Sequence, residues 1–367
     1  MDPRAREMAK IVINHSLKLT KEDTLLIRGD EFYKDYYDII KEEAEALGAK
    51  VILELRNLEE EAALIAGSEE EVAKAGEHLL GLLDQATALV NIKPISNPEY
   101  LKSVPPEKVA HYMGTVRNDY RVKMLGEDGS EGKRWCLLMV PNKPNAEGAG
   151  MTEEEFADFV YGAIIQDWEA MRQDMQTVKD VFDNSKVRIV VPGKTDLTLS
   201  LKGRGGCVSA GDRNMPCGEV FWGPVEDSAN GYITFAFPVE RDGIMLENVR
   251  IEVENGKIIS ATATQGEEYL NVSLEKPGAR FFGELGIGCN YGIHTNCCNT
   301  LLDEKMGGTI HIALGNSYKY PLDNGGGKNT SAIHWDLVCD LRKTDTNPGG
   351  ELWADGKLVQ KDGKWLI

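Results

Sequence analysis

The 367-residue sequence lacks any run of about 18 apolar residues, so no segment of it predicts a membrane-spanning helix. It also lacks an excess of basic residues, because 41 Lys and Arg stand against 59 Asp and Glu, a formal net charge of −18. Nucleic acids and anionic membranes attract clustered Lys and Arg, so we expect neither as a partner. The first residues show no apolar core of a signal peptide, and the seven cysteines are an odd number. We therefore expect reduced thiols and a cytoplasmic protein.

Motifs of several common enzyme classes are absent as well. The sequence contains no P-loop, no HExxH zinc motif, no GxSxG nucleophile motif and no CxxC pair. The glycine-rich stretches at 203–206 and 286–288 do not fit the dinucleotide fingerprint, which has to follow the first strand of a βαβ unit. These absences disfavour enzymes that depend on nucleotides or nicotinamide cofactors.

The first half of the chain alternates apolar runs with stretches of helical periodicity. Short apolar runs at 24–27, 51–53 and 88–90 predict buried strands, and helical spacing of apolar residues lies between them. Fully apolar strands separated by helices are typical of a parallel sheet covered on both faces, so we expect an α/β fold here. Farther along, apolar spacing predicts one long helix over 152–182.

The pattern changes close to residue 185. Leucines alternate with polar residues over 197–201, as in an amphipathic strand, and further β-rich segments with turn residues follow up to the C-terminus. We therefore expect two domains of mixed class, α/β followed by α+β. The first is an N-terminal parallel-sheet α/β domain at 1–185, and the second is a C-terminal domain at 186–367 with a largely antiparallel sheet.

Two strands of the predicted C-terminal domain carry histidine. His334 and Asp336 lie two residues apart in the apolar segment 331–338, so both side chains project from the same face of a strand. His311 lies in a second apolar strand at 309–315. A lone strand histidine is more often a hydrogen-bonded core residue than a ligand, but an imidazole beside a carboxylate offers two metal ligands together.

Two glutamates stand alone among uncharged residues of the same domain. Glu219 lies within 215–221, and Glu284 lies within the glycine-rich segment 281–288. Either could be a cap or a surface residue when taken by itself. Together with Asp336 they would bring three carboxylates into apolar surroundings, which costs much free energy through desolvation and repulsion unless cations neutralise them. We therefore predict that the antiparallel sheet of the C-terminal domain carries a metal site.

The ligand set leaves the number of metals and the reaction open. Three carboxylates and two divalent cations leave a net charge of +1, which favours a bound hydroxide at neutral pH, with the two ions about 3.5–4 Å apart. The residues His311, His334 and Asp336 alone would instead form the 2-His-1-carboxylate site of a mononuclear non-haem iron ring-cleaving dioxygenase. A third possibility is a catalytically silent peptide-binding protein, which predicts a chain that holds no divalent metal.

These segments resemble the M29 family of metallo-aminopeptidases, of the aminopeptidase T and aminopeptidase S type. The similar stretches follow in order along the chain at 214–220, 283–288, 303–315, 317–318 and 331–336. The resemblance is strong over most of the second half and weak at the N-terminus. Each motif alone is a weak indication, whereas the set in this order is specific.

The resemblance implies a metal-dependent aminopeptidase that hydrolyses N-terminal residues from peptides through a hydroxide activated by two metals. It implies two divalent ions per subunit (zinc, cobalt or manganese), peptide substrates with a free N-terminus, and a homodimer. The residues at the positions of the family's metal ligands are Glu219, Glu284, His311, His334 and Asp336. Tyr318 matches the tyrosine beside the metals and would donate to a developing oxyanion. We count Glu219, Glu284 and Tyr318 as catalytic, with one glutamate as proton shuttle.

The sequence departs from the family's pattern in a cysteine-rich stretch that follows Glu284. Cys289, Cys297 and Cys298 either pack as small apolar side chains or serve as reactive or metal-binding thiols beside the site.

Overall fold

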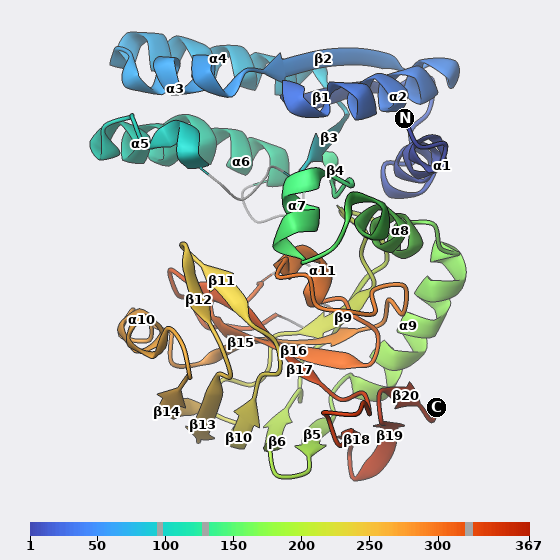
Figure 1. Ribbon diagram of the computed structural model, residues 1–367, viewed down its shortest axis with the longest axis vertical. Helices are drawn as coiled ribbons and strands as arrows, with labels where there is room; N and C mark the ends of the chain where they lie inside the picture. The colour runs from blue at the N-terminus through green and yellow to red at the C-terminus, as the bar shows by residue number, and fades with distance from the viewer. Residues whose placement is uncertain (94–97, 127–131, 320–325) are drawn as a thin grey trace. The chain divides into compact units, whose positions relative to one another are not determined.

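The computed structural model describes residues 1–93, 98–126, 132–319 and 326–367 (Figure 1). The chain divides into two compact units. The first comprises Met1–Asn145, Glu153–Ile165 and Gly211–Pro216, and the second comprises Ala146–Thr152, Gln166–Ala210 and Cys217–Ile367. Both halves of the sequence therefore contribute residues to the first unit.

The first unit is built on a five-stranded sheet in the order β2-β1-β3-β4-β8. All four strand pairs are parallel, which confirms the predicted α/β fold. The strands are β1 (Thr24–Asp30), β2 (Lys50–Arg56), β3 (Ala88–Ile92), β4 (Arg134–Leu138) and β8 (Asn214–Met215). The edge strand β8 comes from the second half of the chain, a pairing between residues far apart in sequence that local patterns do not encode.

Helices pack against this sheet. The helical elements of the first part of the chain are α1 (Arg4–Ile11), η1 (Val12–Ser16), η2 (Glu31–Tyr33), α2 (Lys34–Ala46), α3 (Leu58–Ala66), α4 (Glu69–Gln85), η3 (Pro98–Leu101), α5 (Pro106–Tyr112), η4 (Met113–Arg117), α6 (Asn118–Leu125) and α7 (Lys143–Gly148). Helix α4 begins at a capping box, in which Ser68 and Glu71 satisfy each other's backbone N–H groups. Leu26 and Leu89 of the sheet share a core with Leu83 of α4. No helix among the described residues is long and apolar enough to cross a membrane.

The single long helix predicted over 152–182 is wrong. The structure has two helices there, α8 (Glu153–Ile164) in the first unit and α9 (Trp168–Phe182) in the second. The Asp167 carboxylate accepts a hydrogen bond from the Ala170 backbone N–H at 3.0 Å and thereby begins α9 as a new helix. Apolar periodicity misses this break because Ile164 and Trp168, on either side of it, are both buried.

The second unit contains two larger antiparallel sheets, which confirms the predicted change of fold class. One has the order β14-β13-β10-β6-β5-β18-β19-β20 and the other β17-β16-β15-β9-β7, with β11 and β12 forming a separate pair. The strands are β5 (Lys186–Val191), β6 (Thr195–Ser200), β7 (Cys207–Ser209), β9 (Glu219–Trp222), β10 (Asn230–Thr234), β11 (Val239–Arg241), β12 (Ile244–Leu246), β13 (Arg250–Glu254), β14 (Lys257–Thr262), β15 (Phe282–Gly288), β16 (Thr309–Gly315), β17 (His334–Asp340), β18 (Glu351–Ala354), β19 (Lys357–Lys361) and β20 (Lys364–Trp365). The short helices are α10 (Glu267–Ser273) and α11 (Thr300–Asp303).

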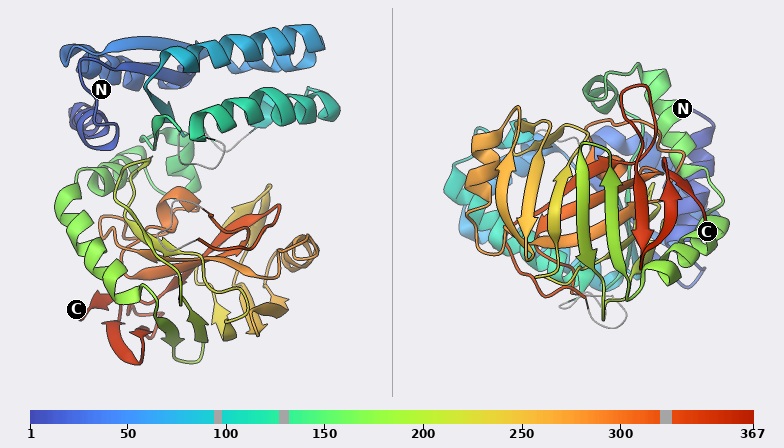
Figure 2. Two further views of the ribbon diagram at one scale, coloured as in Figure 1. Left: turned by 180° about the vertical axis from the view of Figure 1, so that it is seen from behind. Right: turned by 90° about the horizontal axis from the view of Figure 1, so that it is seen from below.

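The two larger sheets of this unit lie face to face and share one apolar core (Figure 2). Ile310, Ile312 and Leu314 of β16 point into that core, together with Leu197 of β6 and Val178 of α9. Side chains alternate between the two faces of a strand, so the residues between these apolar positions project from the opposite face of the five-stranded sheet. That opposite face carries the candidate site.

Candidate metal centre

All five predicted metal ligands lie on one face of the five-stranded antiparallel sheet. Their core-facing neighbours Val220, Leu285, Ile310, Ile312, Trp335 and Leu337 belong to the shared core, so the alternate positions point away from it. The predicted ligands occupy those alternate positions on four adjacent strands: Glu219 on β9, Glu284 on β15, His311 on β16, and His334 and Asp336 on β17.

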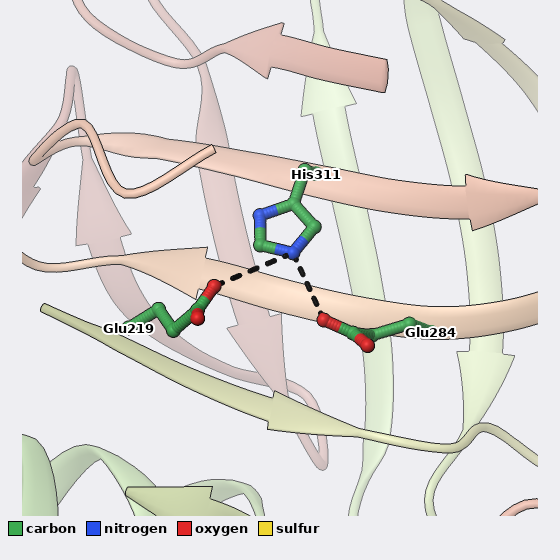
Figure 3. Close-up of side chains that lie close together, drawn as sticks. All are labelled: Glu219, Glu284 and His311. Atoms are coloured by element: carbon green, nitrogen blue, oxygen red, sulfur yellow. Dashed lines mark hydrogen bonds and ion pairs between the residues drawn. The ribbon is translucent and has the colours of Figure 1, made fainter. Parts of the chain in front are cut away.

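The five side chains form one continuous cluster. The Nε2 atom of His311 lies 3.0 Å from Glu284 Oε1 and 3.7 Å from Glu219 Oε2, and Figure 3 shows both carboxylates turned toward this imidazole. The Nε2 atom of His334 lies 3.7 Å from Glu284 Oε2 and 3.3 Å from Asp336 Oδ1. Glu284 therefore lies between the two histidines, with one oxygen toward each.

Backbone carbonyl groups orient both imidazoles. His311 Nδ1 lies 2.8 Å from the carbonyl oxygen of Glu304, and His334 Nδ1 lies 2.8 Å from that of Asn316. A carbonyl oxygen only accepts, so each Nδ1 is the donor and each neutral ring presents Nε2 to the cluster. Outer hydrogen bonds of this kind commonly fix the rings of metal-binding histidines.

One glycine leaves the space that His311 occupies. Gly286 is paired with His311 across β15 and β16. A Cβ atom at Gly286 would lie 2.0 Å from Nε2 of that imidazole. Any larger residue would therefore displace the ring. This steric requirement explains why a glycine stands at position 286, in the glycine-rich segment around Glu284.

A lysine without access to solvent lies beside the cluster, next to Glu219 and Glu304. The side chain of Lys305 is 0% exposed; its Nζ lies 3.4 Å from Glu219 Oε1 and forms an ion pair with Glu304. Burial disfavours the charged ammonium, but the charges of Glu219 and Glu304 outweigh it and raise the pKa of Lys305. The sequence analysis assigned Glu304 and Lys305 no role. The sequence signal that could have indicated a role is the position of this charged pair shortly before the buried strand β16, since charges that become buried require partners.

The cluster shifts the pKa values of its members in opposite directions. Burial raises the pKa of Glu219 and Glu284. Burial favours neutral His311, but the hydrogen bond and charge of Glu284 outweigh it and raise the pKa of the imidazole to about 9. In the same way burial is outweighed at His334, where Asp336 raises the pKa to about 10. Burial would raise the pKa of Asp336 too, but His334 holds it below its usual range.

The donor set fits divalent metal ions. Glu219, Glu284 and His311 offer ligand atoms that all lie within 4.8 Å of one another. Glu284 Oε2 and Asp336 Oδ1 are buried and make no hydrogen bond. Carboxylate oxygens and imidazole nitrogens are ligands of zinc and similar cations, and a cation would satisfy these oxygens.

Tyr318 lies at the edge of the cluster. Its ring centroid is 5.0 Å from that of His334 and 5.7 Å from that of Phe221. The residue is 49% exposed. Desolvation and the surrounding carboxylates, with Glu284 first among them, raise the pKa of the phenol. The hydroxyl therefore stays protonated at neutral pH and keeps a hydrogen to donate.

The cysteine-rich stretch after Glu284 is largely buried. The structure gives no disulfide bond to any of the seven cysteines, all of which lie in its described part. Burial raises the pKa of Cys289 and Cys297, which disfavours their thiolates. The Cys297 thiol donates to Asp303 Oδ1 at 3.3 Å, whereas Cys298 is exposed. These surroundings favour the packing role over the reactive one for Cys289 and Cys297.

The chain belongs to the M29 family of metalloproteases. The family model described as "Thermophilic metalloprotease (M29)" matches residues 1–365, which is nearly the whole sequence. The protein is therefore a member of a metal-dependent peptidase family, as the order of its motifs predicts.

Similar proteins of known name cover the chain from end to end. Aminopeptidase PepS of Streptococcus thermophilus is 24% identical, with 98% of this chain and 97% of the relative covered. The structure of wild-type AmpT from Thermus thermophilus is similar with a TM-score of 0.78 at 21% identity, over 99% of both chains. The structure of 2,5-dihydroxypyridine dioxygenase from Pseudomonas putida KT2440 is similar with a TM-score of 0.62 at 14% identity, over 99% of this chain and 97% of that one. At these identities the two structural likenesses show a shared fold.

Proposed function

We propose that this protein is a metal-dependent aminopeptidase that removes N-terminal residues from peptides. The observation that carries the proposal is the convergence of three carboxylates and two imidazoles on one face of the antiparallel sheet. Two of the carboxylate oxygens are buried and accept no hydrogen bond from the described residues. Membership of the M29 metalloprotease family and the aminopeptidase names of relatives that align over nearly the whole chain support the same activity.

We assign the metal site to Glu219, Glu284, His311, His334 and Asp336. Glu284 has one oxygen toward each histidine, so its carboxylate would hold metal together with both imidazoles. When bound, two divalent cations supply Lewis acidity, which lowers the pKa of a water and polarises the scissile carbonyl.

The protein's own groups would orient the substrate and move protons. Tyr318 keeps a neutral hydroxyl next to His334 and would donate to the oxyanion that develops on the carbonyl. Burial raises the pKa of Glu219 and Glu284, which makes either carboxylate a better base to accept and return a proton during hydrolysis. Lys305 would act through Glu219, because its ammonium group holds that carboxylate from the side opposite to His311.

The metal, the assembly and the compartment are finer parts of this proposal. We propose zinc, cobalt or manganese as the ions and a homodimer as the assembly, both on the family resemblance. We propose a cytoplasmic location because no disulfide joins the seven cysteines in the described part of the chain, which suits a reducing compartment.

A mononuclear iron dioxygenase is the rival function, and the fold alone does not exclude it. The observation in its favour is the structural likeness to 2,5-dihydroxypyridine dioxygenase. That reaction would need only His311, His334 and Asp336. Glu219 and Glu284 in contact range of His311 favour the peptidase, since an iron site of this kind has no use for two further buried carboxylates.

Elemental analysis of the purified protein combined with activity assays separates the two functions. We expect close to two divalent ions per subunit and hydrolysis of aminoacyl-p-nitroanilides that a chelator abolishes. Glu219→Ala and Asp336→Ala should remove this hydrolysis while circular dichroism stays unchanged. One iron per subunit with oxygen consumption, or retained hydrolysis in both variants, would contradict the proposal.

A further inference from the structure

A second charged site lies in the first unit and is rich in arginine. A cavity of about 340 Å³ is lined by four arginines and by no Asp or Glu, within the part of the chain that the structure describes. The arginines are Arg28, Arg56, Arg117 and Arg121. Such a concentration of positive charge is unexpected in a chain of net charge −18. The volume lies at the lower end of the range for small-molecule sites.

Three buried donors around this cavity have no hydrogen-bond partner among residues 1–93, 98–126, 132–319 and 326–367. They are Nε of Arg28, Nε of Arg56 and the hydroxyl of Tyr120. Arg28 and Tyr120 are each only 7% exposed, and the guanidinium carbon of Arg28 lies 5.3 Å from the Tyr120 ring centroid. A buried donor without a partner costs free energy comparable to a lost hydrogen bond, so these groups suit a ligand that accepts from them.

The positive charge is only partly neutralised by the protein. Arg56 Nη1 forms an ion pair with Glu61 Oε2 at 2.6 Å. Arg117 and Arg121 are four residues apart along η4 and α6, which brings like charges together on one helical face. Arg121 Nη2 donates to the neutral amide oxygen of Asn118 at 3.3 Å. An anion in the cavity would relieve this repulsion.

The place of the cavity in the fold is one where ligands commonly bind. Arg28 lies near the carboxyl end of β1, Arg56 ends β2, and Asn91 and Ile92 end β3. In the sheet order β2-β1-β3-β4 the chain passes from β1 to β2 on one side of β1 and then crosses to β3 on its other side. Parallel α/β sheets bind ligands at the carboxyl ends of their strands next to such a reversal of strand order.

We propose that this pocket, the arginine pocket, binds a small organic anion with a phosphate or carboxylate group. The guanidinium groups of Arg28, Arg117 and Arg121 hold the oxyanion, because guanidinium donors match the oxygens of carboxylates and phosphates. The Tyr120 hydroxyl donates to the same group. The apolar part of the ligand packs against the remaining lining, which includes Met113 and Met124. This site is independent of the proposed peptidase activity.

Calorimetric titration of the full-length protein tests the proposal. The probes are phenyl phosphate and phenylacetate. Phenol is the neutral control, and chloride at the same ionic strength is the control for non-specific salt effects. We expect one site per chain for at least one anion, a rise in Tm with that anion, and neither effect with phenol. The two anions distinguish a phosphate ligand from a carboxylate ligand.

Variants locate the binding. Arg28→Met should weaken anion binding about tenfold or more, and Arg121→Gln and Tyr120→Phe should weaken it by smaller factors. Arg121 is exposed and Tyr120→Phe keeps the ring, so these two variants preserve the test if Arg28→Met does not fold. Arg6→Met is the matched control in the same unit, because Arg6 is half-exposed and pairs with Glu42 and Glu43. It should bind as the unaltered chain does.

A Glu284→Ala variant separates this pocket from the metal centre, since metal ions also bind oxyanions. Binding that persists in Glu284→Ala and weakens in Arg28→Met supports the proposal. Binding that is lost in Glu284→Ala but retained in the arginine and tyrosine variants would overturn it. The proposal would also be overturned if neither anion at millimolar concentration gave binding heat or a Tm shift, or if Arg6→Met lost as much anion affinity as Arg28→Met.

Discussion

The two units of this protein each concentrate buried charge, but they balance it in opposite ways. In the second unit, the carboxylates around Glu284 lie beside Lys305 and two imidazoles with raised pKa values, so protein groups supply the compensating positive charge. In the first unit, the buried Nε of Arg28 has no hydrogen bond to the residues that the structure describes. Its stabilising contact is with the Tyr120 ring.

The difference indicates two kinds of ligand site. Histidines that hold protons can release them when a cation arrives, so the acidic cluster can be stable both with and without metal. Arginine cannot release its proton, because its pKa is too high. An incoming anion is therefore the remaining way to neutralise the arginine pocket.

The largest effect should follow from removing the carboxylate between the two histidines. We expect Glu284→Ala to lower aminopeptidase turnover at least about 1000-fold, because several kcal/mol of transition-state stabilisation depend on metal held there. Its metal content should fall in parallel. Glu275→Ala, at an exposed glutamate paired with Arg280, is the control and should keep both. Full activity in Glu284→Ala would show that the acidic cluster is structural.

Removing the compensating lysine should destabilise the second unit. Lys305→Met leaves Glu219 and Glu304 without their buried cation, and breaking a buried ion pair in this way costs about 3–5 kcal/mol. Urea unfolding of the metal-free protein measures the loss. Lys361→Met, in an exposed pair with Glu351, should cost about 0–1 kcal/mol. Equal losses in the two variants would contradict the account of Lys305 as the compensating charge.

The metal-free protein should lose stability as pH rises. The folded-state pKa values are about 9 for His311 and about 10 for His334, both above the ordinary value of 6.5. Their contribution is therefore complete below about pH 6.5 and disappears as pH rises through 9 and 10, a loss on the order of several kcal/mol for the two imidazoles together. Urea unfolding at pH 6.5, 8 and 9.5 tests this.

Two further measurements sharpen the pH test. His311→Gln should weaken the pH dependence, because one of the two titrating imidazoles is gone and His334 remains. Metal affinity should rise over the same pH window, because the ion displaces protons from the imidazoles. A metal-free protein whose stability increases from pH 6.5 to 9.5 would show that the imidazoles are not held protonated by the carboxylates.

The smallest effect on stability is expected in the arginine pocket. Arg28→Met removes a buried guanidinium whose Nε has no hydrogen bond within the described part of the chain, so we expect no opposite charge to be left behind. We expect the free energy of unfolding to change by about 1 kcal/mol or less, with loss of the contact to Tyr120 offset by relief of the buried charge. A loss as large as that expected for Lys305→Met would mean that Arg28 is compensated within the protein.

Local patterns predicted the elements better than their connections. The apolar runs at 24–27, 51–53 and 88–90 correspond to β1, β2 and β3, and the alternation over 197–201 overlaps β6. The break between α8 and α9 was missed, because apolar periodicity does not register a polar cap at Asp167. The edge strand β8 was missed because it is two residues long and pairs with distant residues.

The candidate ligands could be selected from sequence because each is a charged or imidazole side chain in an apolar segment. Sequence patterns do not select Glu304 and Lys305, since they follow Asp303 in a run of three charged residues, and the complete burial of the Lys305 side chain depends on tertiary packing. The arginine pocket had no sequence indication at all. Its arginines are spread from Arg28 to Arg121 and meet only because the parallel strands β1 and β2 and the helical elements η4 and α6 bring them together.

The sequence by itself determined the alternation that turns acidic and imidazole side chains to one face of their strands, since period-two geometry is a property of each strand alone. It also determined the change from parallel to antiparallel architecture. Only the tertiary structure decided which strands are neighbours, that Glu284 faces both histidines, and that four arginines surround a cavity. The physical reason is that register and burial come from contacts between distant segments, whose free energy no local stretch of residues contains.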